Sequence, residues 1–223
     1  IPNRCTLRCS YCPVNRSLAR PKTDLPFELF EEVLARSPTV RTLLPFQWGE
    51  PLLHPRAIDM VELATRRGIR TYLTTNGPRR DRELRGRLLR SGLTRLPVSI
   101  DGDDATHFAT RGTELAPIRE NVLALKRERD ALGAALRIDV SMVVESQTAA
   151  QLESLRAAWG PVVDRVQAIP RMTRGARDTA CREPWRGLLV VLADGRVTTC
   201  CADAEGELAL GDVRQDTPAA IFN

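Results

Sequence analysis

The residues "TLLPFQWGEPLLHPRAIDMVELATRRGIRTYLTT" (42–75) contain two short apolar runs separated by an amphipathic segment. The runs at 42–48 and 69–75 have the length and composition of buried strands. The segment between them has apolar side chains at helical spacing and ends at Gly68, a residue typical of helix ends. A strand, a helix and a second strand in this order predict a right-handed βαβ unit with parallel strands.

The same alternation continues along the chain. Further strands are expected at 95–100, 136–144 and 165–169. Helices are expected after Asp24, across 80–91, around Ile118, Val122 and Leu125, and around Leu152, Leu155 and Trp159. A complete eight-unit barrel takes roughly 250 residues, so the roughly 170 residues before Cys181 hold five or six units. We therefore expect an α/β fold with a partial, open (β/α)6 TIM-like barrel, whose first strand lies at or before Ile1.

The character of the sequence changes after Pro170. Residues 173–180 are polar and contain glycine, as linkers do, and Asp194-Gly195 joins two strand-like runs in the manner of a hairpin turn. The strand-like run "ELALGDV" and the helix-like start "TPAAIFN" follow. We expect a barrel domain over residues 1–172 and a small appendage with a β-hairpin over residues 173–223.

Composition is close to that of soluble globular proteins, with 43% hydrophobic and 27% charged residues. No apolar run approaches the roughly 18 residues of a membrane span, and no signal peptide is evident, so a cytoplasmic protein without membrane contact is expected. The net charge is +5, yet all but Lys22 and Lys126 of the 33 basic residues are arginine. This ratio indicates coding bias in a GC-rich genome more than phosphate binding, and nucleic acid is not the expected partner.

The six cysteines fall into two groups, one at each end of the chain. They are Cys5, Cys9 and Cys12, and then Cys181, Cys200 and Cys201. Polar and charged neighbours surround the first group, which argues against a role as small core residues. A cytosolic setting argues against disulfides. Structural zinc remains an alternative, although such a site requires four ligands and the chain has only two, unpaired histidines.

An iron–sulfur cube binds one thiolate at each iron, so three cysteines leave one iron without a protein ligand. An iron that is open to an external ligand is a reaction site, as is a catalytic zinc with one free position. The spacing of Cys5, Cys9 and Cys12 is therefore typical of a cluster that binds and activates another molecule.

The motif "CTLRCSYC" (5–12) resembles the signature of the radical S-adenosylmethionine (SAM) superfamily, and the resemblance extends over nearly the whole chain. In that family three cysteines hold a [4Fe–4S] cluster whose open iron binds the amino and carboxylate groups of SAM. Reductive cleavage of SAM then gives a 5′-deoxyadenosyl radical. The resemblance implies this cofactor pair here, with Cys5, Cys9 and Cys12 as the iron ligands.

The resemblance also implies a set of SAM-binding residues. They are Tyr11, Gly49, Glu50, Asn76, Ser99 and Met172. Tyr11 matches the aromatic position beside adenine, "WGEP" (48–51) matches the element that receives the methionine amino group, and Ser99 matches a contact to ribose or carboxylate. Trp48 departs from the family's glycine and narrows the space nearby. For "TTNG" (74–77) and "SIDG" (99–102), ordinary turn chemistry is the alternative interpretation.

The appendage resembles the auxiliary-cluster domains called SPASM or, in a shorter form, Twitch. Cys181, Gly195 and Cys200 match the opening of that pattern, and Cys201 is either a third ligand or an inert neighbour. The resemblance implies an auxiliary [4Fe–4S] cluster. Because further cysteine ligands are absent before Asn223, we expect the region to be truncated.

The resemblance implies a radical SAM oxidoreductase or maturase that abstracts hydrogen from a substrate. A small molecule or a peptide is the implied substrate, and an electron donor such as flavodoxin or ferredoxin is the implied partner. No catalytic residue is expected beyond the cluster and the SAM site. The alternatives are a radical SAM enzyme that modifies RNA, suggested only by the basic charge, and a zinc-stabilised binding module without catalysis.

Overall fold

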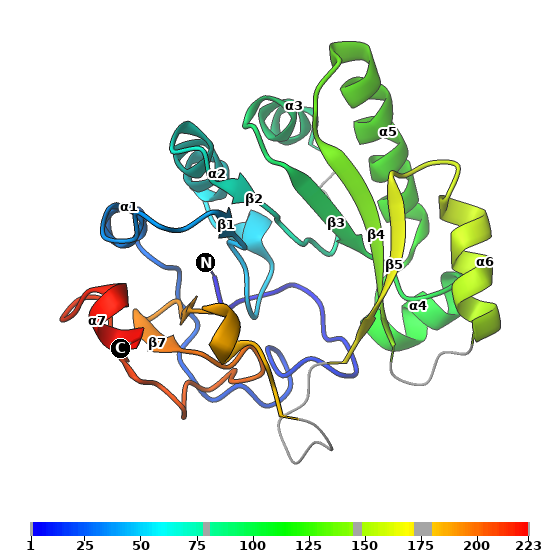
Figure 1. The fold of residues 1–223 in the computed structure, drawn as a ribbon. Helices are drawn as coiled ribbons and strands as arrows, with labels where there is room; N and C mark the ends of the chain where they lie inside the picture. The colour runs from blue at the N-terminus through cyan, green and yellow to red at the C-terminus, as the bar shows by residue number, and fades with distance from the viewer. Residues whose placement is uncertain (1, 78–80, 145–148, 172–179, 223) are drawn as a thin grey trace.

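The computed structural model describes residues 2–77, 81–144, 149–171 and 180–222. Its centre is a curved run of parallel strands with helices on the outer side (Figure 1). The strands are β1 (Thr42–Leu43), β2 (Arg70–Thr71), β3 (Arg95–Ser99), β4 (Arg137–Val144) and β5 (Arg165–Pro170). They pair in parallel as β1 with β2 and as β3 with β4 with β5, and single bridges from Tyr72 and Thr75 to β3 join the two groups. The predicted open parallel barrel is confirmed.

Helices connect these strands, and all of them except α4 (Asp104–Arg111) lie where the sequence predicts a helix. They are α1 (Phe27–Ala35), α2 (Ala57–Arg66), α3 (Arg82–Arg90), α4 (Asp104–Arg111), α5 (Ala116–Leu132) and α6 (Ala149–Trp159), with the short 3-10 turn η1 (Pro51–Leu53). The main core forms where the apolar faces of α2, α3, α5 and α6 meet the strands, with Val61, Leu88, Val122, Leu155 and Val140 among its buried members. Burial of this apolar area is the main stabilising term of the fold.

The appendage is a small antiparallel sheet that lies beside the first residues of the chain (Figure 1). It contains the 3-10 turn η2 (Pro184–Arg186), β6 (Val190–Val191), β7 (Arg196–Thr198), β8 (Gly211–Asp212) and the short helix α7 (Pro218–Phe222). β7 pairs with both β6 and β8. Gly195, at φ +90°, makes the expected hairpin turn, because this backbone region favours glycine.

Two expectations about individual elements differ from the structure. The strand expected at 42–48 ends at Leu43, because Pro45 has no N–H to donate and Phe46 N bonds locally to Leu44 O at 2.7 Å. Helix α4 was not expected at all. The first strand, expected at or before Ile1, lies outside the described residues, as does the proposed domain boundary at 172–173.

No helix in the described part of the chain combines the length and the apolar character that crossing a membrane demands.

Candidate iron–sulfur and cofactor site

The first three cysteines lie on an irregular segment, residues 3–20, which we call the cysteine loop. Side-chain amides hold its backbone in place. Asn15 Nδ2 donates to the carbonyls of Cys5 at 2.7 Å and Leu7 at 2.6 Å. Asn3 bonds to Pro21 O at 2.8 Å and accepts from Thr23 N at 2.6 Å. The loop therefore has a fixed shape without belonging to a helix or a strand.

The thiols of Cys5, Cys9 and Cys12 lie close enough to influence one another. Burial raises the pKa of all three, and to about 11 for Cys9, where the other two thiols add to the effect and Arg111 opposes it. Cys12 N donates to Cys9 O at 3.2 Å, which closes a turn between two of them. Raised pKa values mean that these cysteines are thiols when no metal is bound, so metal binding would release protons.

Cys5, Cys9 and Cys12 are the candidate iron ligands of this loop. In the described ranges, no three Cys, His, Asp or Glu side chains converge on a point suited to a single metal ion. A cube does not require such convergence, because each thiolate binds its own iron. Both histidines are engaged elsewhere: His54 bonds to Leu25 O at 3.0 Å, and His107 Nδ1 accepts from Asp101 N at 3.3 Å. The donor set fits a cluster with one iron open.

A buried polar cluster fixes Tyr11 beside the cysteines. Its hydroxyl donates to Asp101 Oδ2 at 2.7 Å, and Arg111 Nε lies 2.8 Å from the same oxygen. Asp101 Oδ1 accepts from Val143 N at 2.9 Å. Asp101 is 0% exposed and Arg111 5%, so the ion pair is shielded from water and each charge depends on the other. Tyr11 is therefore held between β3, β4 and α4.

Helix α4 also contacts the cysteine loop directly. Ser10 N donates to Thr110 O at 2.8 Å. His107 is fully buried next to Asp101, and burial lowers its pKa to about 4, so the imidazole is neutral at physiological pH. Asp103 caps the helix by accepting from Thr106 N at 2.9 Å.

The "WGEP" element lies against the cysteine loop. Gly49 has φ +140°, and a Cβ on it would lie 2.3 Å from Pro2 O, so only glycine fits there. Glu50 N donates to Arg4 O at 2.9 Å. The Glu50 carboxylate accepts from Thr75 Oγ1 at 2.8 Å and from Asn76 N at 2.7 Å. Burial nevertheless raises its pKa to about 7.

The other predicted cofactor residues are Asn76, Ser99 and Met172, of which the structure describes the first two. Asn76 Nδ2 lies 3.6 Å from Cys5 Sγ, so "TTNG" does reach the cysteine loop. Ser99 ends β3 two residues before Asp101 and pairs in register with Ser141. Met172 lies outside the described residues. The predicted contacts with SAM stay predictions for all six residues: Tyr11, Gly49, Glu50, Asn76, Ser99 and Met172.

The second cysteine group, Cys181, Cys200 and Cys201, also lies close together in the folded chain. Burial raises the pKa of Cys201, and the neighbouring Cys200 and Cys181 add to this effect. Cys181 is exposed. Gln47, in the loop after β1, donates to the carbonyl of Cys201, so this group lies next to the "WGEP" element. The ligand roles of these three cysteines stay predictions.

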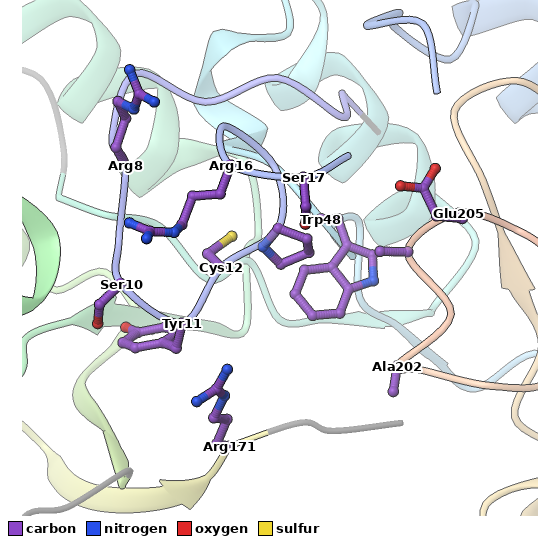
Figure 2. Close-up of a pocket in the computed structure, with 12 residues that line it drawn as sticks. Arg8, Ser10, Tyr11, Cys12, Arg16, Ser17, Trp48, Arg171, Ala202 and Glu205 are labelled. Atoms are coloured by element: carbon purple, nitrogen blue, oxygen red, sulfur yellow. The ribbon is translucent and has the colours of Figure 1, made fainter. Parts of the chain in front are cut away.

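A cavity of about 750 Å³ lies between the cysteine loop and the appendage (Figure 2). Its walls include Tyr11, Cys12 and Trp48 on the barrel side and Ala202 and Glu205 on the appendage side. Arg8, Arg16 and Arg171 complete the wall. One iron-ligand candidate thus faces a space large enough for a small ligand.

The residues that support the site are not apparent from the sequence. Asp101-Gly102 has the pattern of an ordinary turn, and neither Arg111 nor His107 falls in a predicted helix or strand. The signal was present, because Asp103 and Gly112 are typical helix start and stop residues around α4.

The fold is an open α/β barrel, and two groups of cysteines lie beside it as candidate iron–sulfur ligands. A family model for the radical SAM superfamily matches residues 1–156, and a model for an iron–sulfur cluster-binding domain, SPASM, matches residues 181–223. The chain belongs to the radical SAM superfamily. Its cofactors are accordingly a [4Fe–4S] cluster and SAM, and the SPASM domain implies auxiliary iron–sulfur binding.

Several curated proteins resemble the chain in sequence. It is 29% identical over 161 residues to the tungsten-containing aldehyde ferredoxin oxidoreductase cofactor-modifying protein of Pyrococcus furiosus, covering 70% of this chain and 45% of that protein. It is 29% identical to the PqqA peptide cyclase of Streptomyces rochei over 65% of this chain and 39% of the cyclase. It is 37% identical to GTP 3′,8-cyclase 2 of Mycobacterium tuberculosis over 56% of this chain and 37% of the cyclase. The matched region thus spans less than half of each relative.

Solved structures share the fold at low sequence identity. Streptococcus suis SuiB bound to S-adenosylmethionine has a TM-score of 0.75 at 14% identity, covering 100% of this chain and 64% of SuiB. Native anSMEcpe with bound AdoMet has a TM-score of 0.76 at 17% identity, covering 99% of this chain and 78% of anSMEcpe. These likenesses support the architecture of barrel plus appendage.

Proposed function

We propose that this chain is the catalytic part of a radical SAM oxidoreductase or maturase that modifies a peptide. The observation that carries the proposal is the trio of Cys5, Cys9 and Cys12 on one loop, with Cys12 at the wall of a cavity. When bound, the cluster and SAM supply a carbon radical that can abstract hydrogen from an unactivated position. Such chemistry starts without a general base.

The residues of the chain would position the reactants. Cys5, Cys9 and Cys12 would hold the cluster, while the loop formed by Gly49 and Glu50 would face the methionine end of SAM. The Asp101–Arg111 pair would keep Tyr11 at the cavity wall. Cys181, Cys200 and Cys201 would bind an auxiliary cluster on the opposite side of the cavity, where it could accept an electron from a substrate radical.

A peptide substrate has support from several related proteins. One curated relative is a PqqA peptide cyclase, SuiB has been solved bound to the precursor peptide SuiA, and anSMEcpe has been solved with a Cp18Cys peptide. A small-molecule substrate is the second candidate, because the chain is 37% identical to a GTP 3′,8-cyclase over part of its length. The reductant would be a small electron carrier such as flavodoxin or ferredoxin.

Substrate-dependent turnover tests the peptide proposal. Short peptides encoded next to the gene are incubated anaerobically with the reconstituted protein, SAM and reduced flavodoxin, and peptide mass is followed by mass spectrometry. A true substrate is expected to lose hydrogen and to increase 5′-deoxyadenosine formation together. Conversion of GTP or another small molecule to a new product, separated by chromatography, and of no peptide, would favour the second candidate.

A further inference from the structure

The cavity wall carries an excess of positive charge. Arg8, Arg16 and Arg171 line it, and Glu205 is the single carboxylate among its lining residues in the described structure. That carboxylate accepts hydrogen bonds from the backbone N–H groups of Ala19 at 2.8 Å and Arg20 at 3.2 Å, so it serves to dock the appendage. Its charge lies on the appendage side of the cavity, opposite Arg16 (Figure 2).

The guanidinium groups differ in direction. Arg16 and Arg171 extend from opposite walls toward the space around Tyr11 and Cys12, whereas Arg8 points away at the rim (Figure 2). Arg8 and Arg16 form no ion pair with any carboxylate in the part of the chain that the structure describes. A cavity in whose lining arginines outnumber carboxylates favours ligands of negative charge.

We propose that Arg16 and Arg171 bind an acidic group of the substrate and so place the neighbouring substrate atoms beside the SAM site. A planar guanidinium fork matches a carboxylate or a phosphate with two parallel hydrogen bonds. The inference rests on the proposed function, in which the substrate is a peptide, and it assigns a Glu or Asp side chain near the modified residue. A phosphate presents the same oxyanion chemistry from a different source.

The competing role for these arginines is to balance the charge of the cluster, because Cys12 lines the same cavity. Iron and sulfide content distinguishes the two roles. Under the substrate role, an Arg16→Gln/Arg171→Gln variant takes up as much iron and sulfide as the unmodified chain. A clear loss of both would assign the arginines to the cluster and overturn the proposal.

Peptide binding to the reconstituted, SAM-loaded protein tests the proposal itself. Fluorescein-labelled decapeptides that differ only in carrying three Glu or three Gln residues are compared by fluorescence anisotropy. The unmodified protein is expected to bind the Glu peptide at least about tenfold more tightly, the effect of one charge-assisted hydrogen bond. The Arg16→Gln/Arg171→Gln variant is expected to lose this preference.

The matched control is Arg66→Gln/Arg67→Gln at the exposed end of α2, which removes the same charge away from the cavity lining. It is expected to retain the preference, and an equal loss in both variants would indicate nonspecific charge attraction and overturn the proposal. Calorimetry with inorganic triphosphate forms the second arm. A third result is possible: the unmodified protein binds triphosphate, the Arg16→Gln/Arg171→Gln variant does not, and neither prefers the Glu peptide. This result would support the oxyanion site and indicate that the substrate is phosphorylated.

If neither probe binds in a way that depends on the two arginines, the proposal is wrong. The proposed function is judged separately, by formation of 5′-deoxyadenosine in the same preparations. If 5′-deoxyadenosine forms but binding does not depend on the arginines, the arginine proposal has failed. If no 5′-deoxyadenosine forms, the proposed function has failed.

Discussion

Asp101 is a single carboxylate on which three parts of the site depend. It joins Tyr11 of the cysteine loop, Arg111 of α4 and the backbone of Val143 on β4. Asp101 and Arg111 are buried, so a change in one partner leaves the other with an uncompensated charge or an unfilled hydrogen bond.

Arg111→Met should therefore be strongly destabilising. It leaves Asp101 buried without its counter-charge, which costs about 3–5 kcal/mol in comparable buried pairs. The measurement is the free energy of unfolding from urea titration. Arg36→Met is the control, because Arg36 pairs with Glu32 at the surface, where such pairs contribute roughly 0–1 kcal/mol. Equal losses in the two variants would show that the Asp101–Arg111 pair has no special role.

At this scale the sequence points to candidate ligands more clearly than to the residues that hold them in place. Cys5, Cys9 and Cys12 lie within one short loop, so their spacing alone carries the signal. Tyr11 and Asp101 are 90 residues apart and meet only because β3 ends beside the cysteine loop. No local pattern reports such a contact, and Asp101-Gly102 looks like an ordinary turn.

Among the elements, the loop around Gly49 links the "WGEP" segment to the start of the cysteine loop. Gly49→Ala would place a Cβ 2.3 Å from Pro2 O and should displace one segment from the other. Iron and sulfide bound after anaerobic reconstitution are expected to fall. Gly68→Ala is the matched control, since Gly68 also has a positive φ, +70°, but no atom within 4 Å of the added Cβ. Full iron uptake by Gly49→Ala would contradict this role.

Arg20 connects the cysteine loop to the appendage. It is buried, donates to Ala204 O at 2.7 Å and pairs with Asp194 at 3.1 Å. Arg20→Met is expected to raise amide hydrogen exchange over residues 194–206, because the contacts that order this segment are lost. Arg186→Met, which alters an exposed pair within the appendage, should leave that exchange unchanged. Unchanged exchange in Arg20→Met would mean that other contacts dock the appendage.

Most elements were predictable, because long helices and buried strands carry strong apolar periodicity. Helix α4 was missed for a physical reason: its buried side chains are His107 and Arg111, so the face that contacts the core is polar. Periodicity of apolar residues cannot detect a helix that serves a polar site.

For the whole molecule, the cavity at the junction of barrel and appendage is the central feature. The two cysteine groups lie in different parts of the chain, so their metal contents should respond independently. A Cys181→Ala/Cys200→Ala variant is expected to bind less iron and sulfide than the unmodified protein and still cleave SAM. If that variant lost no iron, the second cysteine group would not be a cluster site in this chain.

The central claim is that three cysteines leave one iron free for SAM, and its most direct test is 5′-deoxyadenosine formation. The reconstituted protein is incubated without oxygen with SAM and dithionite, and the product is measured by mass spectrometry. We predict product with the unmodified chain and essentially none with Cys9→Ala. No product from the unmodified chain, or as much from Cys9→Ala, would contradict the account.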